Sequence, residues 1–356
     1  MQVDTQKKER IMTAESVSAT QPGTQSTVQS TYQSAHQSTQ GKFKFISQAT
    51  ESSLFRNDQV MIQRDADGNT ALVKGVTMEP ETLAVYNART MGQHQPSCEK
   101  NGFELLNSPL LDDSLDLLNH SAVVEHYYAQ CEALVGGITG CRAYAFDHNV
   151  RSAKGKKDGE RLAAGQDVQG PAHVVHGDYT LRSGPDRLQQ LAHPPSGNDT
   201  LTGYLAENTA LIPQQLVAKA VASSQRFAII NVWRNISDQP VQTYPMALCD
   251  AQTVQPEELV VFEIHYTDRI GENYFSKFSP QHRMYYYPEM TRDEALVIKQ
   301  WDSAGALARS GGAQPDASEP DAPCTFSFHS AFVDPDTASD APDRCSIEVR
   351  CMVIYD

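Results

Sequence analysis

The sequence predicts a mainly β fold with flanking helices, and three observations lead to that prediction. Short stretches of alternating apolar and polar residues recur along the chain after residue 41. Two longer stretches repeat apolar residues at helical spacing instead. Two segments that contain histidine, residues 173–180 and 328–332, have the composition of strands.

The N-terminal part of the chain divides into a tail and an annex. Residues 1–41 repeat Gln, Ser and Thr with few apolar side chains, so we expect a disordered, low-complexity tail. Residues 42–140 are expected to form a β-hairpin and a helical annex of the single domain 42–356. Alternating stretches flank a turn signal at 65–69, and a helix is predicted over 112–134, before two glycines.

Residues 141–356 carry the remaining strand signals and are predicted to form the core of the domain. A loop insertion rich in Ala, Gly, Pro and Asp interrupts this core at 304–323. Helices are expected at 185–191 and 209–224, and strands at 142–148, 227–233, 259–266, 284–287, 296–301 and 344–355.

The strand segment at 173–180 offers two metal ligands. His176 and Asp178 stand two residues apart, so on an extended strand both side chains point to the same face. A third imidazole, from His329, would complete a two-histidine, one-carboxylate face that suits non-haem Fe(II). The triplet alone also fits hydrogen-bonded surface residues. His265 and His282 are rival third ligands, but no strand with an Arg-x-Ser pattern follows either of them at the right distance.

The last strand predicts a carboxylate clamp. Alternation places Arg344, Ser346, Glu348 and Arg350 on one face of it. An arginine with a serine two residues later can hold the distal carboxylate of 2-oxoglutarate, whose other end chelates iron. A surface ion pair between Arg344 and either Asp343 or Glu348 is the alternative.

Other side chains are candidates for holding the co-substrate or the substrate, and each also has a structural explanation. Arg234, at the exit of a buried strand, suits a carboxylate or an exposed salt bridge, and Arg350 is a further candidate for binding the co-substrate. Weaker candidates for substrate contacts, by residue type and place near the predicted pocket, are Tyr179, Trp233, Asp147, His148 and Arg283.

Composition limits the partners and the compartment. A formal net charge of −15, without an extended basic run, argues against nucleic acid. No apolar stretch approaches the roughly 20 residues that span a bilayer, so no membrane is expected. Seven scattered cysteines without a C-x-x-C pair predict reduced thiols and a cytoplasmic protein. We expect a small-molecule substrate and allow for a homodimer.

A family resemblance covers most of the chain from about residue 85 to residue 355. The matching segments are residues 85–89, 101–105, 146–151, 176–180, 231–234, 282–283 with 287–290, 293–296, 328–332 and 346–350. Together they resemble the fungal hydroxylase/desaturase family of secondary metabolism, which is related to gibberellin desaturase and to the cephem methoxylase component.

The resemblance implies a double-stranded β-helix (jelly-roll, cupin-like) core and an Fe(II)- and 2-oxoglutarate-dependent oxygenase that uses O2. His176, Asp178 and His329 would be the iron ligands. The implied reaction removes hydrogen from an unactivated C–H bond of a small molecule, giving hydroxylation, desaturation or ring closure, with succinate and CO2 as co-products. The alternatives are a non-catalytic partner subunit of an oxygenase heterodimer and a metal-independent, cupin-like isomerase or hydrolase.

Overall fold

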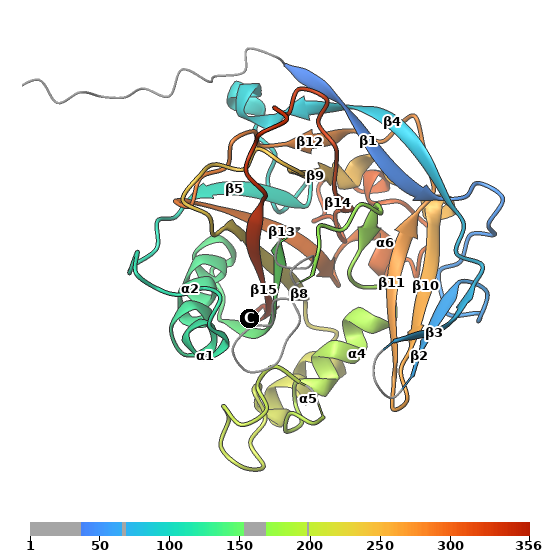
Figure 1. Ribbon diagram of the computed structural model, residues 1–356. Coiled ribbons are helices and arrows are strands. Elements are labelled where there is room, and N and C mark those ends of the chain that lie inside the picture. Colours follow the sequence, from blue (N-terminus) through green and yellow to red (C-terminus); the bar gives the residue numbers. More distant parts are fainter. Residues whose placement is uncertain (1–36, 66–68, 153–168, 198) are drawn as a thin grey trace, which may run out of the picture. The chain divides into compact units, whose positions relative to one another are not determined.

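Two β-sheets form the core of the unit His36–Asp356 (Figure 1). The computed structural model describes residues 37–65, 69–152, 169–197 and 199–356. In pairing order, the long sheet contains β1 (Ser38–Ile46), β4 (Met78–Asn87), β12 (Met284–Tyr286), β9 (Met246–Cys249), β14 (His329–Ala331), β7 (His176–Gly177), β11 (Ile270–Ser276), β10 (Leu259–His265), β2 (Met61–Arg64) and β3 (Thr70–Lys74). The short sheet contains β5 (Phe103–Asn107), β13 (Glu294–Asp302), β8 (Phe227–Asn235), β15 (Cys345–Ile354) and β6 (Ala143–Ser152).

An apolar cluster joins the two sheets. Trp233 and Leu296 of the short sheet pack in it with Leu248 and Tyr285 of the long sheet. A second, larger cluster covers the other face of the short sheet, so β8 is buried along its whole length. The short sheet is therefore a middle layer, with the long sheet on one side and helices on the other.

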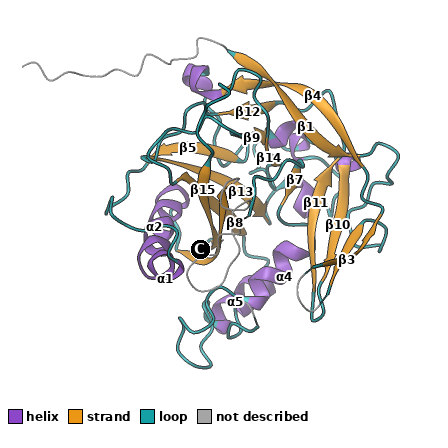
Figure 2. Ribbon diagram, in the orientation of Figure 1, coloured by secondary structure: helices purple, strands orange, loops and turns teal. Residues whose placement is uncertain are grey.

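Helices cover the outer face of the short sheet, and strands make up most of the regular structure (Figure 2). One helical rod runs from residue 120 to residue 139; the Asn119 side chain caps its start and Gly140, at φ 69°, ends it. A π-helical turn lies within this rod. The α-helices are α1 (His120–Ala122), α2 (Tyr128–Thr139), α4 (Ser183–Gln190), α5 (Gln214–Ala222) and α6 (Ala306–Arg309).

The structure confirms the predicted fold class and corrects several boundaries. Residues 38–41, expected in the tail, are the first residues of β1 and pair with β4; residues 1–36 of the predicted tail lie outside the described residues. The segment 173–180 is a strand only at His176–Gly177, so Asp178 follows the strand. The expected loop at 304–323 contains α6 and the buried Asp316, whose carboxylate accepts from the backbone amides of Leu307 and Thr325.

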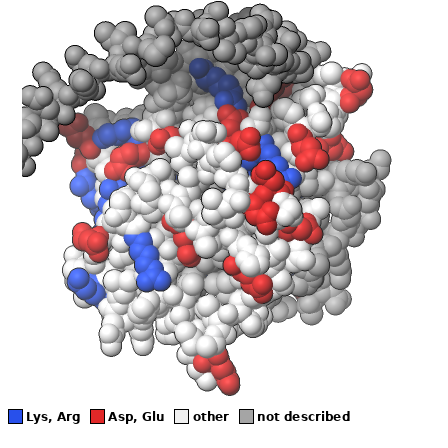
Figure 3. All heavy atoms as spheres, turned by 90° about the vertical axis from the view of Figure 1, so that its left-hand side faces the viewer, with Lys and Arg blue, Asp and Glu red and all other residues white. Residues whose placement is uncertain are grey.

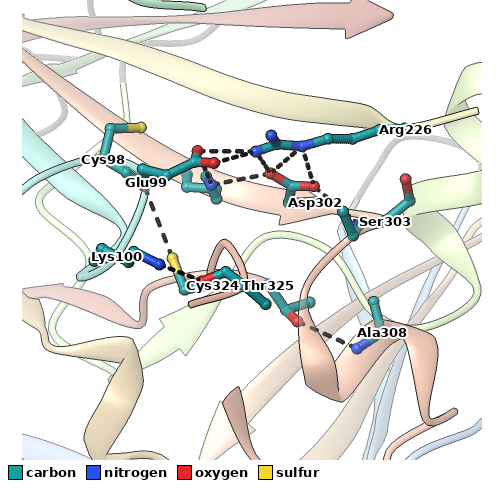
Figure 4. Close-up of polar contacts among 12 residues, drawn as sticks. Cys98, Glu99, Lys100, Arg226, Asp302, Ser303, Ala308, Cys324 and Thr325 are labelled. Atoms are coloured by element: carbon teal, nitrogen blue, oxygen red, sulfur yellow. Dashed lines mark hydrogen bonds and ion pairs between the residues drawn. The ribbon is translucent and has the colours of Figure 1, made fainter. Parts of the chain in front are cut away.

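A buried ionic network fixes the end of β13 (Figure 4). Asp302 is fully buried, and its Oδ2 lies 2.9 Å from Lys299 Nζ and 2.6 Å from Arg226 Nη2. Glu99 extends the network, with Oε2 at 3.2 Å from Lys299 Nζ. Since these contacts join β13 to the start of β8 and to the loop before β5, they hold three parts of the short sheet together.

Asp302→Asn is expected to lower the free energy of unfolding by about 3–5 kcal/mol, because two cations would lose a buried carboxylate. Urea denaturation followed by circular dichroism measures this loss. Asp336→Asn, at an exposed position, serves as the control and should change stability by no more than about 0.5 kcal/mol. Equal stability of the two variants would contradict the assigned importance of the network.

Candidate active site

Two histidines meet because their strands are neighbours in the long sheet. β7 and β14 pair antiparallel, with His176 directly opposite His329, so both side chains lie on one face. Their ring centroids are 4.4 Å apart, and both residues are buried. His176 Nδ1 donates to the carbonyl oxygen of Val174 at 2.7 Å, which leaves Nε2 of the neutral ring as an acceptor.

Asp178 directly follows Gly177, the last residue of β7, and completes the cluster. Its Oδ1 lies 3.7 Å from His176 Nε2 and 3.9 Å from His329 Nε2. One ligand atom from each of these three residues falls within 4.8 Å of the other two. Two imidazole nitrogens and one carboxylate oxygen therefore converge, as a two-histidine, one-carboxylate metal site requires.

The short sheet holds the second oxygen of Asp178. Asn231 of β8 donates to Oδ2 at 3.1 Å, and Arg350 of β15 donates to the same atom from Nε and Nη2, each at 3.3 Å. Sequence reasoning missed Asn231, although it opens the segment 231–234 that carries part of the family resemblance. Only Oδ1 remains directed toward the histidines.

Gln300 is a further residue that sequence reasoning missed. Its Oε1 accepts from the backbone amide of Asp178 at 3.1 Å, and its Nε2 lies 3.4 Å from His329 Nδ1. Gln300 is fully buried on β13 and contacts two of the three candidate ligands. No local motif marks it, because its place depends on how β13 packs behind the site.

The protonation states suit metal binding. Burial would raise the pKa of Asp178, but the positive charge of Arg350 opposes this effect, and the pKa lies well below its usual value. Burial, with the neighbouring His329, lowers the pKa of His176 to about 3. At neutral pH the site thus offers a carboxylate and an unprotonated imidazole, the forms that bind a metal.

Buried polar atoms without partners gather at the start of β15. The guanidinium of Arg344 is buried, with Nε and Nη2 lacking hydrogen-bond partners among the described residues, and the same holds for Ser346 Oγ and Trp233 Nε1. Arg344 lies over the Trp233 ring, 5.6 Å from its centroid. Burial and the nearby Arg151 lower the pKa of Arg344 to about 9. Buried, unsatisfied donors beside a buried cation fit a carboxylate ligand.

Arg350 occupies a different place from the one expected of a co-substrate ligand. Besides its contacts with Asp178, its Nη1 donates to Asp147 Oδ2 at 2.7 Å. Asp147 Oδ1 in turn accepts from the hydroxyl of Thr200. The guanidinium is therefore paired with two carboxylates. Asp147 lies on the inner side of β6, where it contacts Arg350.

Four other candidates contact groups other than the three candidate ligands. Arg234 faces the helices and donates to Tyr127 Oη at 2.9 Å and to the carbonyl of Arg292. His148 also faces the helices, with Nδ1 2.9 Å from Tyr128 Oη. Tyr179 packs against the apolar cluster under the helices, and Arg283 is exposed before β12. None of these four residues has a hydrogen bond or ion pair to the three candidate ligands among the described contacts.

The rival histidines are each paired with a glutamate. His282 Nε2 lies 2.8 Å from Glu258 Oε2. His265 Nε2 lies 2.8 Å from Glu263 Oε2 and 3.8 Å from Asp58 Oδ1, and this second group could also surround an ion. Backbone amides of Asn57 and Asp58 already bind the other oxygen of Glu263. This group is thus internally satisfied, whereas Arg344 and Ser346 keep unsatisfied buried donors.

Comparison with known proteins identifies the class. The family described as "Oxidoreductase/YMDC permease-like domain" matches residues 43–354, so the chain belongs to this family. The solved structure of the "iron and alpha-ketoglutarate-dependent endoperoxidase NvfI" shares the fold, with a TM-score of 0.63 and 21% identity over 90% of this chain and 99% of that one. The jelly-roll core is therefore confirmed.

Two curated relatives are similar to the chain over more than half of its length. The "Uncharacterized protein in dcmA 3'region" of Methylophilus leisingeri is 41% identical over 54% of this chain and 88% of its own length. The "Fe(II)/2-oxoglutarate-dependent dioxygenase nvfI" of Aspergillus novofumigatus is 27% identical over 83% of this chain and 95% of its own. The predicted family of fungal hydroxylase/desaturase-type oxygenases is confirmed, and with it an enzyme of a class that uses Fe(II), 2-oxoglutarate and O2 on small molecules.

The position of His148 leads to a pH prediction. Burial lowers its pKa to about 4, although the nearby Asp147 opposes the shift. The unfolded chain, with a histidine pKa of about 6.5, then binds the extra proton between pH 6.5 and 4. The part of the stability that depends on a neutral His148 is fully present above pH 6.5 and is lost as the pH falls toward 4.

His148→Asn should therefore make the free energy of unfolding less steep in pH between 6.5 and 4, by up to about 1.4 kcal/mol per pH unit. Urea titrations at several pH values measure the slope. Tyr128→Phe removes the hydrogen bond to His148 but no group that titrates between pH 6.5 and 4. It should therefore lower stability without flattening the slope. An unchanged slope in His148→Asn would refute the prediction.

Proposed function

We propose that the protein binds Fe(II) through His176, Asp178 and His329 and holds 2-oxoglutarate with Arg344 and Ser346. The observation that carries the proposal is the convergence of three ligand atoms within 4.8 Å at the inner face of the long sheet. The unsatisfied donors of Arg344, just before β15, and of Ser346 in β15 supply the second half of the argument. Residues 42–356 would act as one oxygenase domain.

Each residue has a stated task in this proposal. The two imidazoles and one carboxylate oxygen would hold the metal and leave its other positions open. Arg344 would bind the distal carboxylate of 2-oxoglutarate through Nε and Nη2, with the Ser346 hydroxyl donating to the same group. When bound, iron chelated by 2-oxoglutarate would supply the chemistry that lets O2, as the oxidant, attack an unactivated C–H bond. Gln300 would steady His329 and the backbone at Asp178.

The substrate is proposed to be a small molecule of secondary metabolism, with hydroxylation, desaturation or ring closure as the outcome. Placement of the substrate relative to the metal decides among these outcomes. The non-catalytic and metal-independent alternatives are disfavoured, because the three candidate ligands are present together and the relatives are named as oxygenases. The proposal keeps Asp147 at the metal site, through Arg350, and assigns no role at this site to His148, Arg234 or Arg283.

Partners and compartment follow the same proposal. On the face in Figure 3, Lys and Arg are interspersed with Asp and Glu, which gives no basic surface for nucleic acid there. No helix in the described part of the chain is long and apolar enough to cross a bilayer. The seven cysteines are free thiols, which supports a cytoplasmic location. A homodimer stays a prediction.

Anaerobic addition of Fe(II) and then 2-oxoglutarate should produce the weak visible charge-transfer band of the chelate in the wild type. His329→Ala should abolish the band, because the metal loses one of three ligands. Arg344→Leu should leave Fe(II) binding intact while raising the dissociation constant of 2-oxoglutarate by about 10-fold or more, the loss of a charge-assisted pair.

Exposed His94 provides the matched control, since His94→Ala removes an imidazole far from these contacts in the sequence and at the surface. It should retain the full band. Absence of a band in the wild type at saturating metal and 2-oxoglutarate would refute the proposed function. An unchanged band in His329→Ala would refute the ligand assignment alone.

A further inference from the structure

We propose that Arg350 is a positioning residue that keeps Asp178 bound to the metal through one oxygen and thereby reserves a coordination position for the co-substrate. The proposal rests on the function proposed above and deepens it. It concerns a residue that the sequence had suggested as a ligand of 2-oxoglutarate and that the structure shows paired with carboxylates instead.

The two oxygens of Asp178 have different neighbours. Arg350 donates twice to Oδ2, from Nε and Nη2 at 3.3 Å each, and Asn231 adds a third hydrogen bond at 3.1 Å. Oδ1 receives none of these donors and faces the two imidazoles. Three donors occupy the lone pairs that a carboxylate would need to chelate a metal with both oxygens.

Arg350 is itself held from the opposite side. Its Nη1 is 2.7 Å from Asp147 Oδ2, and Asp147 stands opposite Arg350 in the pairing of β15 with β6. The hydroxyl of Thr200 donates to the other oxygen of Asp147. An irregularity in the register follows directly, between Arg350 and Cys351. The guanidinium is fixed between two carboxylates, so it cannot follow Asp178 if that side chain turns.

This arrangement matters because it would set how many coordination positions on the metal stay open. A metal of octahedral geometry held by two imidazoles and one carboxylate oxygen keeps three positions, two for the oxo acid end of 2-oxoglutarate and one for O2. Chelation by both oxygens of Asp178 would remove one of them. The charge of Arg350 also repels a cation, so its loss should not weaken attraction of Fe(II) to the site.

Arg350→Gln therefore separates two affinities. The dissociation constant of 2-oxoglutarate for the Fe(II)-loaded protein should rise by about 10-fold or more, because the freed second oxygen of Asp178 would compete with the co-substrate for one coordination position. The dissociation constant of Fe(II), measured anaerobically against a chelator, should change by less than about threefold. The charge-transfer band, weak at moderate 2-oxoglutarate, should return at high concentration.

Arg234→Gln is the matched control, because Arg234 is also buried in the short sheet but faces the helices. It should lower thermal stability and leave both dissociation constants unchanged. Asp147→Asn tests the proposal without altering the guanidinium and covers the case in which Arg350→Gln does not fold. It should also raise the dissociation constant of 2-oxoglutarate, by a smaller factor than Arg350→Gln does.

Two results would overturn the proposal. One is an Arg350→Gln protein whose 2-oxoglutarate affinity matches the wild type. The other is a parallel loss of Fe(II) and 2-oxoglutarate binding, which would make Arg350 a general structural support. Either result, obtained while the wild type forms the chelate, leaves the proposed function standing. No chelate in the wild type would instead remove the proposed function.

Discussion

The pairing of β7 with β14 is the constraint on which the site depends. It sets His176 opposite His329, on the face of the long sheet that meets the short sheet. Because Leu248 of β9 pairs with His329, the apolar cluster between the sheets continues beside the imidazoles. The rings are thus held within a packed interior, and burial keeps His176 unprotonated.

The short sheet places charged side chains near this histidine pair. Alternation along β15 sends apolar residues such as Val349 toward the helices and Glu348 and Arg350 toward the long sheet. Asn231 then bridges the two carboxylates of Asp178 and Glu348. Such polar groups are costly to bury unless each finds a partner, so their mutual contacts determine how the two sheets meet.

The candidate ligands were predictable because two short motifs report them. His176 and Asp178 are two residues apart, and His329 precedes an Arg-x-Ser strand. Asn231 and Gln300 carry no such motif, since their roles arise from packing between distant strands. The strand pattern gave the fold class, but the 304–323 insertion was expected to be a loop because its Gly and Pro content hides the buried Asp316 that organises it.

Face parity explains which candidates were misplaced. Neighbouring residues on a strand point to opposite faces, so His148 could not share the interior with Asp147, nor Arg234 with Trp233. Each pair was expected near one pocket because residue type was weighed without parity. The same rule explains the buried donors without partners: Arg344 and Ser346 have the same parity as Glu348 and so share the inner face with it. An unsatisfied buried donor costs about 1–3 kcal/mol, so a carboxylate that satisfies them would stabilise the fold as it binds.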